Sequence, residues 1–379
     1  MTEDQYLGNL YQRFPVTIEK GLGAHVWDTN GKEYIDCMGG YGVALVGHRN
    51  ERVVNAIKSQ IDKIITVHSS LYSKTREEFL ETLFKVAPHG LTQVHLNNSG
   101  AEAIEAAMKF ARKFTGKKGM IAMNGSYHGK SMGALSITFN PKYRKAFQPL
   151  VDKVTFSPFG DIESLRSKID SDTAFIVLEP IQGESGIHVA PDGFLQDVRK
   201  ICDENDILLI FDEIQAGLGR TGRMWASEHW NTVPDILCIA KGIAGGVPMG
   251  ATIVRPDILD CINKGEHSST FGGNPLSCAA GTATLQALTQ DGLIDNAERR
   301  GKMFKDGLEA LKEKHNIIRE IRGKGLMIGI ELKFEVRDIL MEGIEKNLLL
   351  LYSGRNILRL LPPLVITEQD VIRSLEILD

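Results

Sequence analysis

The chain has 379 residues, of which 42% are hydrophobic and 24% charged, and its formal net charge is −4. This composition is typical of a globular enzyme and not of a disordered or fibrous chain. The net charge and the lack of a basic block argue against nucleic acid as a partner, and no stretch reaches the ~20 apolar residues of a membrane helix.

The cysteines and the N-terminus indicate the cellular compartment of the protein. The five cysteines, at positions 37, 202, 238, 261 and 278, are scattered and include no Cys-x-x-Cys pair. They predict reduced thiols and no metal site. Residues 1–4 lack the charged and apolar regions of a signal peptide. We therefore expect a cytoplasmic protein that is not bound to a membrane.

In chain order, the first predicted element is a β-hairpin at residues 24–36, around an Asn30-Gly31 turn. Apolar residues at helical spacing then predict a helix over Ala101–Phe114. Three short apolar runs that each end in a polar residue predict strands: Phe175–Leu178, Ile207–Phe211 and Ile236–Ala240. From about Ala280 onward, long helical patterns lead to a strand at Leu326–Ile330 and to a last strand before Arg359.

The alternation of helical and strand patterns in the centre favours an α/β fold with a mostly parallel sheet flanked by helices. The two ends of the chain differ from this centre. We predict that residues 46–279 form a large domain around the sheet. Residues 1–45 are predicted to join residues 280–379 in a smaller α+β domain.

Two predicted strands deliver an acid and a lysine to the same edge of the sheet. Asp212 follows Ile207–Phe211, and Lys241 follows Ile236–Ala240. Open α/β sheets bind ligands at strand ends. A pyridoxal phosphate (PLP) enzyme needs both groups, because a lysine carries the cofactor as a Schiff base and an acid pairs with its pyridinium nitrogen. Two simpler interpretations remain open: a magnesium-binding strand of a nucleotide hydrolase, and a solvated loop lysine.

Two further segments suit a cofactor phosphate. Ser99 and Glu102 have the spacing of a capping box at the start of a helix, where unpaired N–H groups attract phosphate and where Gly100 permits close approach. Gly125–Ser131 nearly matches the nucleotide-binding loop, which is the main competing hypothesis. It has only three residues between its glycines where that loop needs four. In the alternative interpretation Tyr127 lies against a cofactor ring, with His128 nearby.

Together these segments resemble the class III (ω-amino acid) aminotransferases of PLP fold type I. The likeness runs from Tyr11–Val16 to Leu360–Leu364. The matching motifs are Asn98–Ala103, Tyr127–Gly129, Glu179–Glu184, Asp212–Gln215, Lys241–Gly242 and Ser269–Pro275. The resemblance implies a PLP-dependent aminotransferase that takes its amino group from, or gives it to, glutamate and 2-oxoglutarate.

The resemblance also implies roles for individual residues. Lys241 would hold the cofactor and shuttle the proton at the reacting carbon, and Asp212 would keep the pyridine nitrogen protonated. The other cofactor contacts implied are Ser99, Gly100 and Ala101 at the phosphate, Tyr127 and His128 at the ring, and Gln215 at the phenolic oxygen. Thr270 would reach the cofactor phosphate of a neighbouring subunit, which implies a homodimer with shared active sites.

On the substrate side, the resemblance assigns Arg359 to the carboxylate of glutamate and Glu184 to masking that arginine when an ω-amine is bound. A guanidinium suits this work because it holds a carboxylate through two parallel hydrogen bonds. A fixed structural salt bridge is the alternative. The remaining substrate contacts implied are Tyr11, Tyr41, Lys130 and Ser269.

Within the class, the chain is most similar to enzymes of arginine and lysine biosynthesis that act on acetylornithine, or on ornithine or lysine attached to a small acidic carrier protein. Lys130 stands where acetylornithine enzymes have an arginine, and it resembles putrescine aminotransferases there. Diamines, free ornithine and aminomutase chemistry therefore remain alternatives. Docking of a carrier would need a basic surface at the site entrance, which the sequence by itself does not show.

Overall fold

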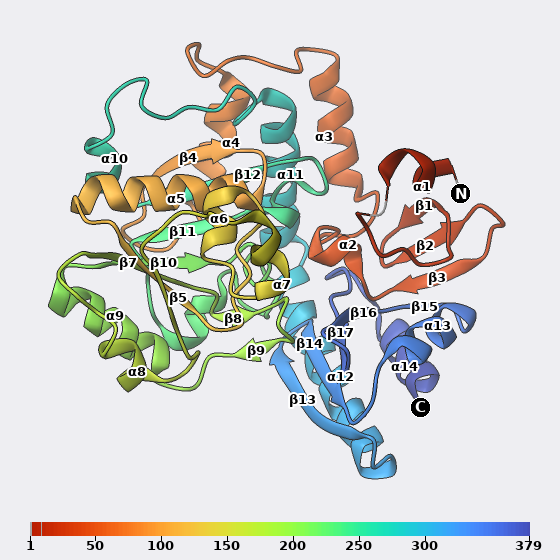
Figure 1. Ribbon diagram of the computed structural model, residues 1–379. Helices are drawn as coiled ribbons and strands as arrows, with labels where there is room; N and C mark the ends of the chain where they lie inside the picture. The colour runs from red at the N-terminus through yellow and green to blue at the C-terminus, as the bar shows by residue number, and fades with distance from the viewer. Residues whose placement is uncertain (1, 9) are drawn as a thin grey trace.

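The structure, a computed structural model, describes residues 2–8 and 10–379. Its centre is a seven-stranded sheet in the order β4-β12-β11-β10-β7-β5-β6 (Figure 1). The strands are β4 (Gln93–Asn97), β5 (Gly119–Met123), β6 (Val154–Ser157), β7 (Thr173–Leu178), β10 (Leu208–Asp212), β11 (Ile236–Ile239) and β12 (Gly250–Val254). Of these seven, β12 alone runs opposite to the other six, so the expected mostly parallel sheet is confirmed.

Both faces of this sheet are covered. Strand β10 is buried along its whole length. Leu208 and Ile210 pack in one apolar cluster with helix α5 (Gly100–Thr115), whereas Leu209 and Phe211 pack in a second cluster. Because successive side chains of a strand point to opposite faces, this division explains why the sheet strands read as unbroken apolar runs.

The helices around the sheet include the one predicted before β5. They are α3 (Glu51–Ile61), α4 (Lys74–Phe84), α5, α6 (Met132–Ser136), α7 (Pro141–Arg144), α8 (Ile162–Arg166), α9 (Phe194–Asn205), α10 (Pro256–Asp260) and α11 (Pro275–Gln290), with the 3-10 helices η1 (Lys145–Phe147), η2 (Ala226–Trp230) and η3 (Lys241–Ala244). Helix α5 is one residue longer at each end than predicted. Only half of its predicted capping box forms, because the Glu102 carboxylate accepts from the N–H of Asn98 and not from that of Ser99.

The two ends of the chain lie side by side (Figure 1). Strands β1 (Ile18–Leu22), β2 (His25–Asp28), β3 (Glu33–Asp36) and β15 (Leu348–Leu349) form one sheet, and β13 (Ile318–Lys324), β14 (Met327–Leu332), β17 (Ile357–Leu360) and β16 (Leu351–Ser353) form another. Helices α1 (Thr2–Leu7), α2 (Gly39–Gly42), α12 (Leu293–Lys314), α13 (Arg337–Glu345) and α14 (Glu368–Leu378) complete this region, and a short hairpin, β8 (Ile181–Gln182) and β9 (His188–Val189), lies near the sheet.

Several predicted elements are confirmed with shifted ends. The hairpin at residues 24–36 is β2 and β3, which pair antiparallel. The last strand continues through Arg359 to Leu360 instead of ending before it, since the arginine takes part in the β14–β17 pairing. The predicted domain boundary near residue 280 falls inside α11, and the division into domains stays a prediction. Within residues 2–8 and 10–379, no helix is both long and apolar enough to cross a membrane.

Candidate active site

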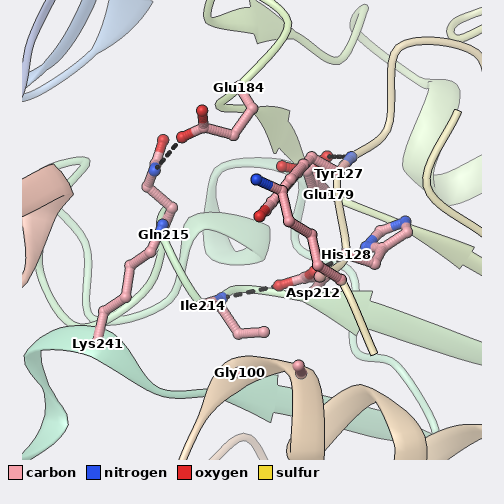
Figure 2. Close-up of a pocket in the computed structure, with 12 residues that line it drawn as sticks. Gly100, Tyr127, His128, Glu179, Glu184, Asp212, Ile214, Gln215 and Lys241 are labelled. Carbon is pink, nitrogen blue, oxygen red and sulfur yellow. Dashed lines mark hydrogen bonds and ion pairs between the residues drawn. The ribbon is translucent and has the colours of Figure 1, made fainter. Parts of the chain in front are cut away.

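A cavity of about 230 Å³ lies where β10 and β11 end (Figure 2). Ligands of open α/β sheets bind at this edge because the carboxyl ends of parallel strands meet there. The cavity is lined by Gly100, Ala101, Tyr127, His128, Gly129, Lys130, Glu179, Glu184, Asp212, Ile214, Gln215 and Lys241. It therefore brings together most of the predicted site residues, from segments spread over more than 140 positions.

Lys241 begins η3 just after β11, and its side chain extends toward Gln215 and Glu184 in Figure 2. Its φ of 50° is in the left-handed region, which costs a non-glycine residue roughly 1 kcal/mol and is common at functional sites. Burial lowers the pKa of Lys241, and Arg359 lowers it further, while Glu184 acts against both. A buried lysine with a lowered pKa is able to act as a base near neutral pH.

Asp212, the last residue of β10, is held by two donors. One carboxylate oxygen is 2.7 Å from Nδ1 of the buried His128, and the other accepts the N–H of Ile214 at 3.0 Å. Burial opposes a charge on His128, but its hydrogen bond to Asp212 and the attraction between them raise the pKa of the imidazole. The pair therefore fixes the direction in which Asp212 faces the cavity.

The N-terminus of α5 forms another side of the cavity. Ser99 caps the helix through its hydroxyl and does not line the cavity. The N–H groups of Gly100 and Ala101 face the cavity end of the helix, and neither donates to any residue within 2–8 or 10–379. A methyl group added to Gly100 would lie 2.9 Å from the side chain of Ile214. A larger residue at position 100 would therefore require the Ile214 side chain to shift.

Glu179 lines the cavity, although no role was predicted for it. One carboxylate oxygen accepts the N–H of Tyr127 and the other accepts that of Gly183, both at 3.1 Å. Burial raises the pKa of Glu179 to about 7, with His128 opposing the shift and Asp212 adding to it. A signal was available, because Glu179 follows the buried strand β7 just as Asp212 ends β10.

Glu184 and Arg359 form a bidentate ion pair at one end of the cavity. The two guanidinium nitrogens lie 2.9 and 3.2 Å from the two carboxylate oxygens. Burial alone would raise the pKa of Glu184, but Arg359 and Lys241 lower it below its usual value. Gln215 donates to the same carboxylate at 3.2 Å, and its own carbonyl oxygen is buried without a partner in the described chain. The ring of Tyr41 lies 5.8 Å from the guanidinium carbon.

Lys130 lies at the mouth of the cavity and is exposed. Its ammonium is 4.9 Å from the ring centre of Tyr143, which packs edge-on against the ring of Tyr127 at 5.9 Å. An ammonium over an aromatic face is held by a cation–π attraction without losing its charge. Lys130 therefore places its ammonium group next to the opening.

Besides Ser99, Tyr41 and Arg359, which lie beside the cavity without lining it, three predicted site residues lie outside it in the described chain. Ser269 and Thr270 line a separate cavity of about 320 Å³, where Asn98 donates to the Ser269 hydroxyl at 3.2 Å. Tyr11 is 63% exposed near the N-terminus. Their roles stay predictions, since a second subunit or a bound substrate would have to bring them to the site.

The competing hypothesis of a nucleotide-binding loop at Gly125–Ser131 is wrong. The backbone N–H groups of residues 126–128 already donate to protein acceptors at 2.9 to 3.1 Å, so they are not free to cradle phosphates. In addition, Lys130 lies over Tyr143 instead of over the loop. Among the residues that the structure describes, no cluster of His, Cys, Asp and Glu could hold a metal ion.

Comparisons with known proteins agree with this geometry. A family model described as aminotransferase class-III matches residues 6–379. The chain is 43% identical to an acetylornithine aminotransferase of Methanopyrus kandleri, over 98% of this chain and 95% of the relative. It is 41% identical to the LysW-aminoadipate semialdehyde/glutamate semialdehyde transaminase of Sulfolobus acidocaldarius, over 96% and 93%.

The solved structures agree as well. An ornithine aminotransferase of Toxoplasma gondii, with PLP at partial occupancy in its active site, is 34% identical and superposes with a TM-score of 0.95 over 99% of this chain and 91% of that one. The family match spans nearly all of the sequence, and the lysine, the acid and the helix N-terminus converge on one cavity. The chain therefore belongs to the class III aminotransferases, which depend on PLP.

Proposed function

We propose that the protein is an ω-aminotransferase that moves the terminal amino group of an N-blocked ornithine or lysine to or from 2-oxoglutarate and glutamate, in arginine or lysine biosynthesis. The blocking group is an acetyl group or a small acidic carrier protein. The relatives from M. kandleri and S. acidocaldarius support this choice of substrates. In the site itself, the observation that carries the proposal is the paired Glu184 and Arg359.

The residues of the cavity fit PLP. The free N–H groups of Gly100 and Ala101, at the positive end of the α5 dipole, suit the phosphate. Tyr127 offers an aromatic face, and Asp212 offers a buried carboxylate for a protonated ring nitrogen. Lys241 supplies the amine that holds the cofactor. When bound, PLP supplies an electron sink for the carbon that bears the reacting amine.

Lys241 is also the base that moves the proton at the reacting carbon. A lysine does this only in its neutral form, and burial favours that form by lowering the pKa of Lys241. Asp212 keeps its orientation through His128 and Ile214, so that it stabilises positive charge at one fixed place. A close pair of opposite charges is worth ~4 kcal/mol at an effective dielectric of 20.

Glu184 and Arg359 let one cavity accept two unlike substrates. Glutamate carries a carboxylate beside its amine, whereas the terminal carbon of an ω-amine carries none. With the ω-amine bound, Glu184 keeps the guanidinium neutralised, as the structure has it. With glutamate or 2-oxoglutarate bound, Glu184 moves away and the substrate carboxylate takes its place on Arg359.

Lys130 favours a blocked amino acid over a diamine. An N-blocked ornithine or lysine keeps its α-carboxylate at the end remote from the reacting amine, and this anion suits the charged Lys130 at the cavity mouth. Putrescine would place its second ammonium there and be repelled. Because an ammonium binds a carboxylate oxygen as a point charge, Lys130→Arg should tighten N-acetylornithine binding through a two-fold contact. Unchanged or weaker binding would contradict this placement.

The proposal includes a homodimer. In it, Thr270 reaches the cofactor phosphate of the neighbouring subunit, and Ser269, Tyr11 and Tyr41 contact substrate. The isolated chain supports this in one respect. Ser269 and Thr270 line an open cavity away from their own Lys241, which leaves them available to a neighbour. Sedimentation of the purified protein with and without PLP measures the oligomeric state directly.

The substrate is tested by mixing the yellow holoenzyme with single amines in the absence of any keto acid. N-acetylornithine should bleach the yellow absorption rapidly, and ornithine and putrescine should do so at least ~10-fold more slowly, since a change of ~1.4 kcal/mol in binding suffices for that factor. A response to putrescine alone would overturn the proposal in favour of a diamine aminotransferase.

A further inference from the structure

Arg220 is a fully buried guanidinium without a carboxylate partner. Its side chain is 0% exposed, and among residues 2–8 and 10–379 no aspartate or glutamate forms an ion pair with it. Arg359 is almost as deeply buried, but it is paired with Glu184. Burial lowers the pKa of Arg220 to about 9. Because an unpaired buried charge is unfavourable, the contacts that this guanidinium does make require an explanation.

Arg220 binds two backbone carbonyl groups of the C-terminal region. Its Nη1 donates to the carbonyl oxygen of Leu326 at 3.1 Å and also to that of Pro362. In return, the N–H of Leu326 donates to the Arg220 carbonyl oxygen at 3.0 Å. The two segments approach so closely that a Cβ on Gly325 would lie 2.8 Å from that same oxygen. Arg220 therefore joins the loop after β10 to the β13–β14 turn and to the segment after β17.

The sequence after β17 explains why a donor is needed there. Residues 361–364 are Leu-Pro-Pro-Leu, and all four are buried. Proline has no N–H group, so Pro362 and Pro363 cannot continue the hydrogen bonding of β17. Their carbonyl groups still need donors, because a buried backbone carbonyl without a partner is unfavourable. In the part of the chain that the structure describes, the Pro362 carbonyl accepts from Arg220 alone. The guanidinium therefore holds the middle of this segment.

Arg220 belongs to a loop that is itself fixed next to the candidate active site. The loop follows β10, and it is closed at its base by the buried carboxylate of Glu213, which accepts the N–H of Ser227 at 2.9 Å. Gln215, in the same loop, lines the cavity and donates to the Glu184 carboxylate at 3.2 Å. One loop therefore contacts the ion pair through Gln215 and holds the segment behind the paired arginine through Arg220.

We propose that Arg220 is a positioning residue for the carboxylate of glutamate and 2-oxoglutarate. Pro362 lies just beyond β17, the strand that presents the Arg359 guanidinium, so the segment that Arg220 holds directly continues that strand. Fixing this segment to the loop of Gln215 fixes the Arg359 guanidinium relative to the cavity. The inference rests on the proposed function, which assigns Arg359 to the substrate carboxylate. Arg220 does not line the cavity and acts only through Arg359.

Arg220→Met tests this role, because it keeps an unbranched apolar side chain and removes every donor. The holoenzyme is mixed in separate stopped-flow experiments with glutamate and with N-acetylornithine, and bleaching of the yellow absorption is followed. The second-order rate constant with glutamate should fall at least ~10-fold, since misplacing a binding group by ~1 Å can lower a rate by up to ~100-fold. The rate constant with N-acetylornithine should stay within about threefold of the wild-type value, because its terminal carbon carries no carboxylate for Arg359.

Two measurements separate positioning from a general loss of stability. The affinity of the apoenzyme for PLP, followed by the return of the yellow absorption, should be unchanged, because Arg220 bonds to the C-terminal region and not to the residues that would hold the cofactor. The matched control is Arg199→Met, which removes a largely buried guanidinium from its pair with Asp235, just before β11 begins. This control should lower Tm and affect neither half reaction more than the other.

Arg220→Lys provides the test if the methionine variant does not fold. Its ammonium lies one bond nearer the backbone than Nη1, so it should hold the two carbonyl groups less well and show the same split to a smaller extent. An equal fall in both half reactions, an unchanged reaction with glutamate, or the same split in Arg199→Met would overturn the proposal. If the wild type reacts with glutamate but not with N-acetylornithine, the proposed function fails. The positioning role is then decided by the same comparison with whichever ω-amine bleaches the enzyme.

Discussion

Replacing Glu184 with glutamine tests the two-substrate arrangement, because it removes the charge that masks Arg359 and changes little else in shape. In the wild type, an incoming carboxylate must displace two charge-assisted hydrogen bonds of 2.9 and 3.2 Å. Each such bond is worth about 1.5–3 kcal/mol, and a neutral amide oxygen can replace only one of them, at about 1 kcal/mol. In the wild type, water solvates the Glu184 carboxylate once it is released, which offsets part of this difference. The variant should therefore bind glutamate and 2-oxoglutarate more tightly than the wild type by about 2 kcal/mol, or ~30-fold.

The same substitution should have the opposite effect on the ω-amine. An unmasked guanidinium repels a substrate ammonium at roughly 5 Å by about 3 kcal/mol at an effective dielectric of 20, so kcat/KM for N-acetylornithine should fall by at least ~10-fold. Stopped-flow measurement of each half reaction separates the two effects. The control is Glu331→Gln, which removes a similarly buried carboxylate from an arginine pair that does not line the cavity. If both half reactions of Glu184→Gln change by the same factor, the masking argument is refuted.

Three further predictions address the cofactor lysine, the overlooked acid and a remote ion-pair cluster. Lys241→Ala should abolish turnover between any amine and 2-oxoglutarate; measurable steady-state cycling would contradict the assignment. Glu179→Gln should raise KM for both substrates by roughly 10-fold, since an amide accepts at one oxygen only and leaves one backbone N–H unpaired at a cost of about 1–3 kcal/mol. The remote cluster contains His25 and Asp370. The hydrogen bond between their side chains raises the pKa of His25 despite burial, and it lowers the pKa of Asp370 against the effect of burial. The contribution of His25 to folding stability is fully present below pH ~6.5 and is lost as pH rises through its folded pKa. That of Asp370 is present above pH ~4 and is lost on further acidification. The difference in Tm between wild type and His25→Gln should therefore be larger at pH 5.5 than at pH 8.5.

The sequence alone predicts that Asp212 and Lys241 lie together, because the prediction needs only the general geometry of parallel sheets. Each follows an apolar run, and the carboxyl ends of neighbouring parallel strands meet at one edge. The structure pairs β10 and β11 in parallel, so the two residues come from adjacent strand ends. Glu179 follows the next strand, β7, and the same reasoning applied once more would have included it.

The pairing of Glu184 with Arg359 has no such signal. The two residues are 175 positions apart, and they meet only because β17 of the C-terminal region lies beside the turn that follows β8. Neither periodicity nor spacing encodes that contact, so only the family resemblance indicated it.

The hydrogen bonds of Glu179 could not be predicted for a different reason. Both of its partners are backbone N–H groups, which leave no trace in residue type.

In the proposed cycle, the ion pair would also let Lys241 serve both half reactions. Glu184 raises the pKa of Lys241 and Arg359 lowers it, so their effects oppose each other while they are joined, and burial then dominates and favours the neutral amine. In the proposed cycle, the carboxylate of glutamate replaces that of Glu184 on Arg359. The end of the cavity therefore carries the same net charge with either substrate, and Lys241 keeps the same tendency to lose its proton. In Glu184→Gln this balance is lost only while the ω-amine is bound, because glutamate supplies a carboxylate to Arg359 and the ω-amine supplies none.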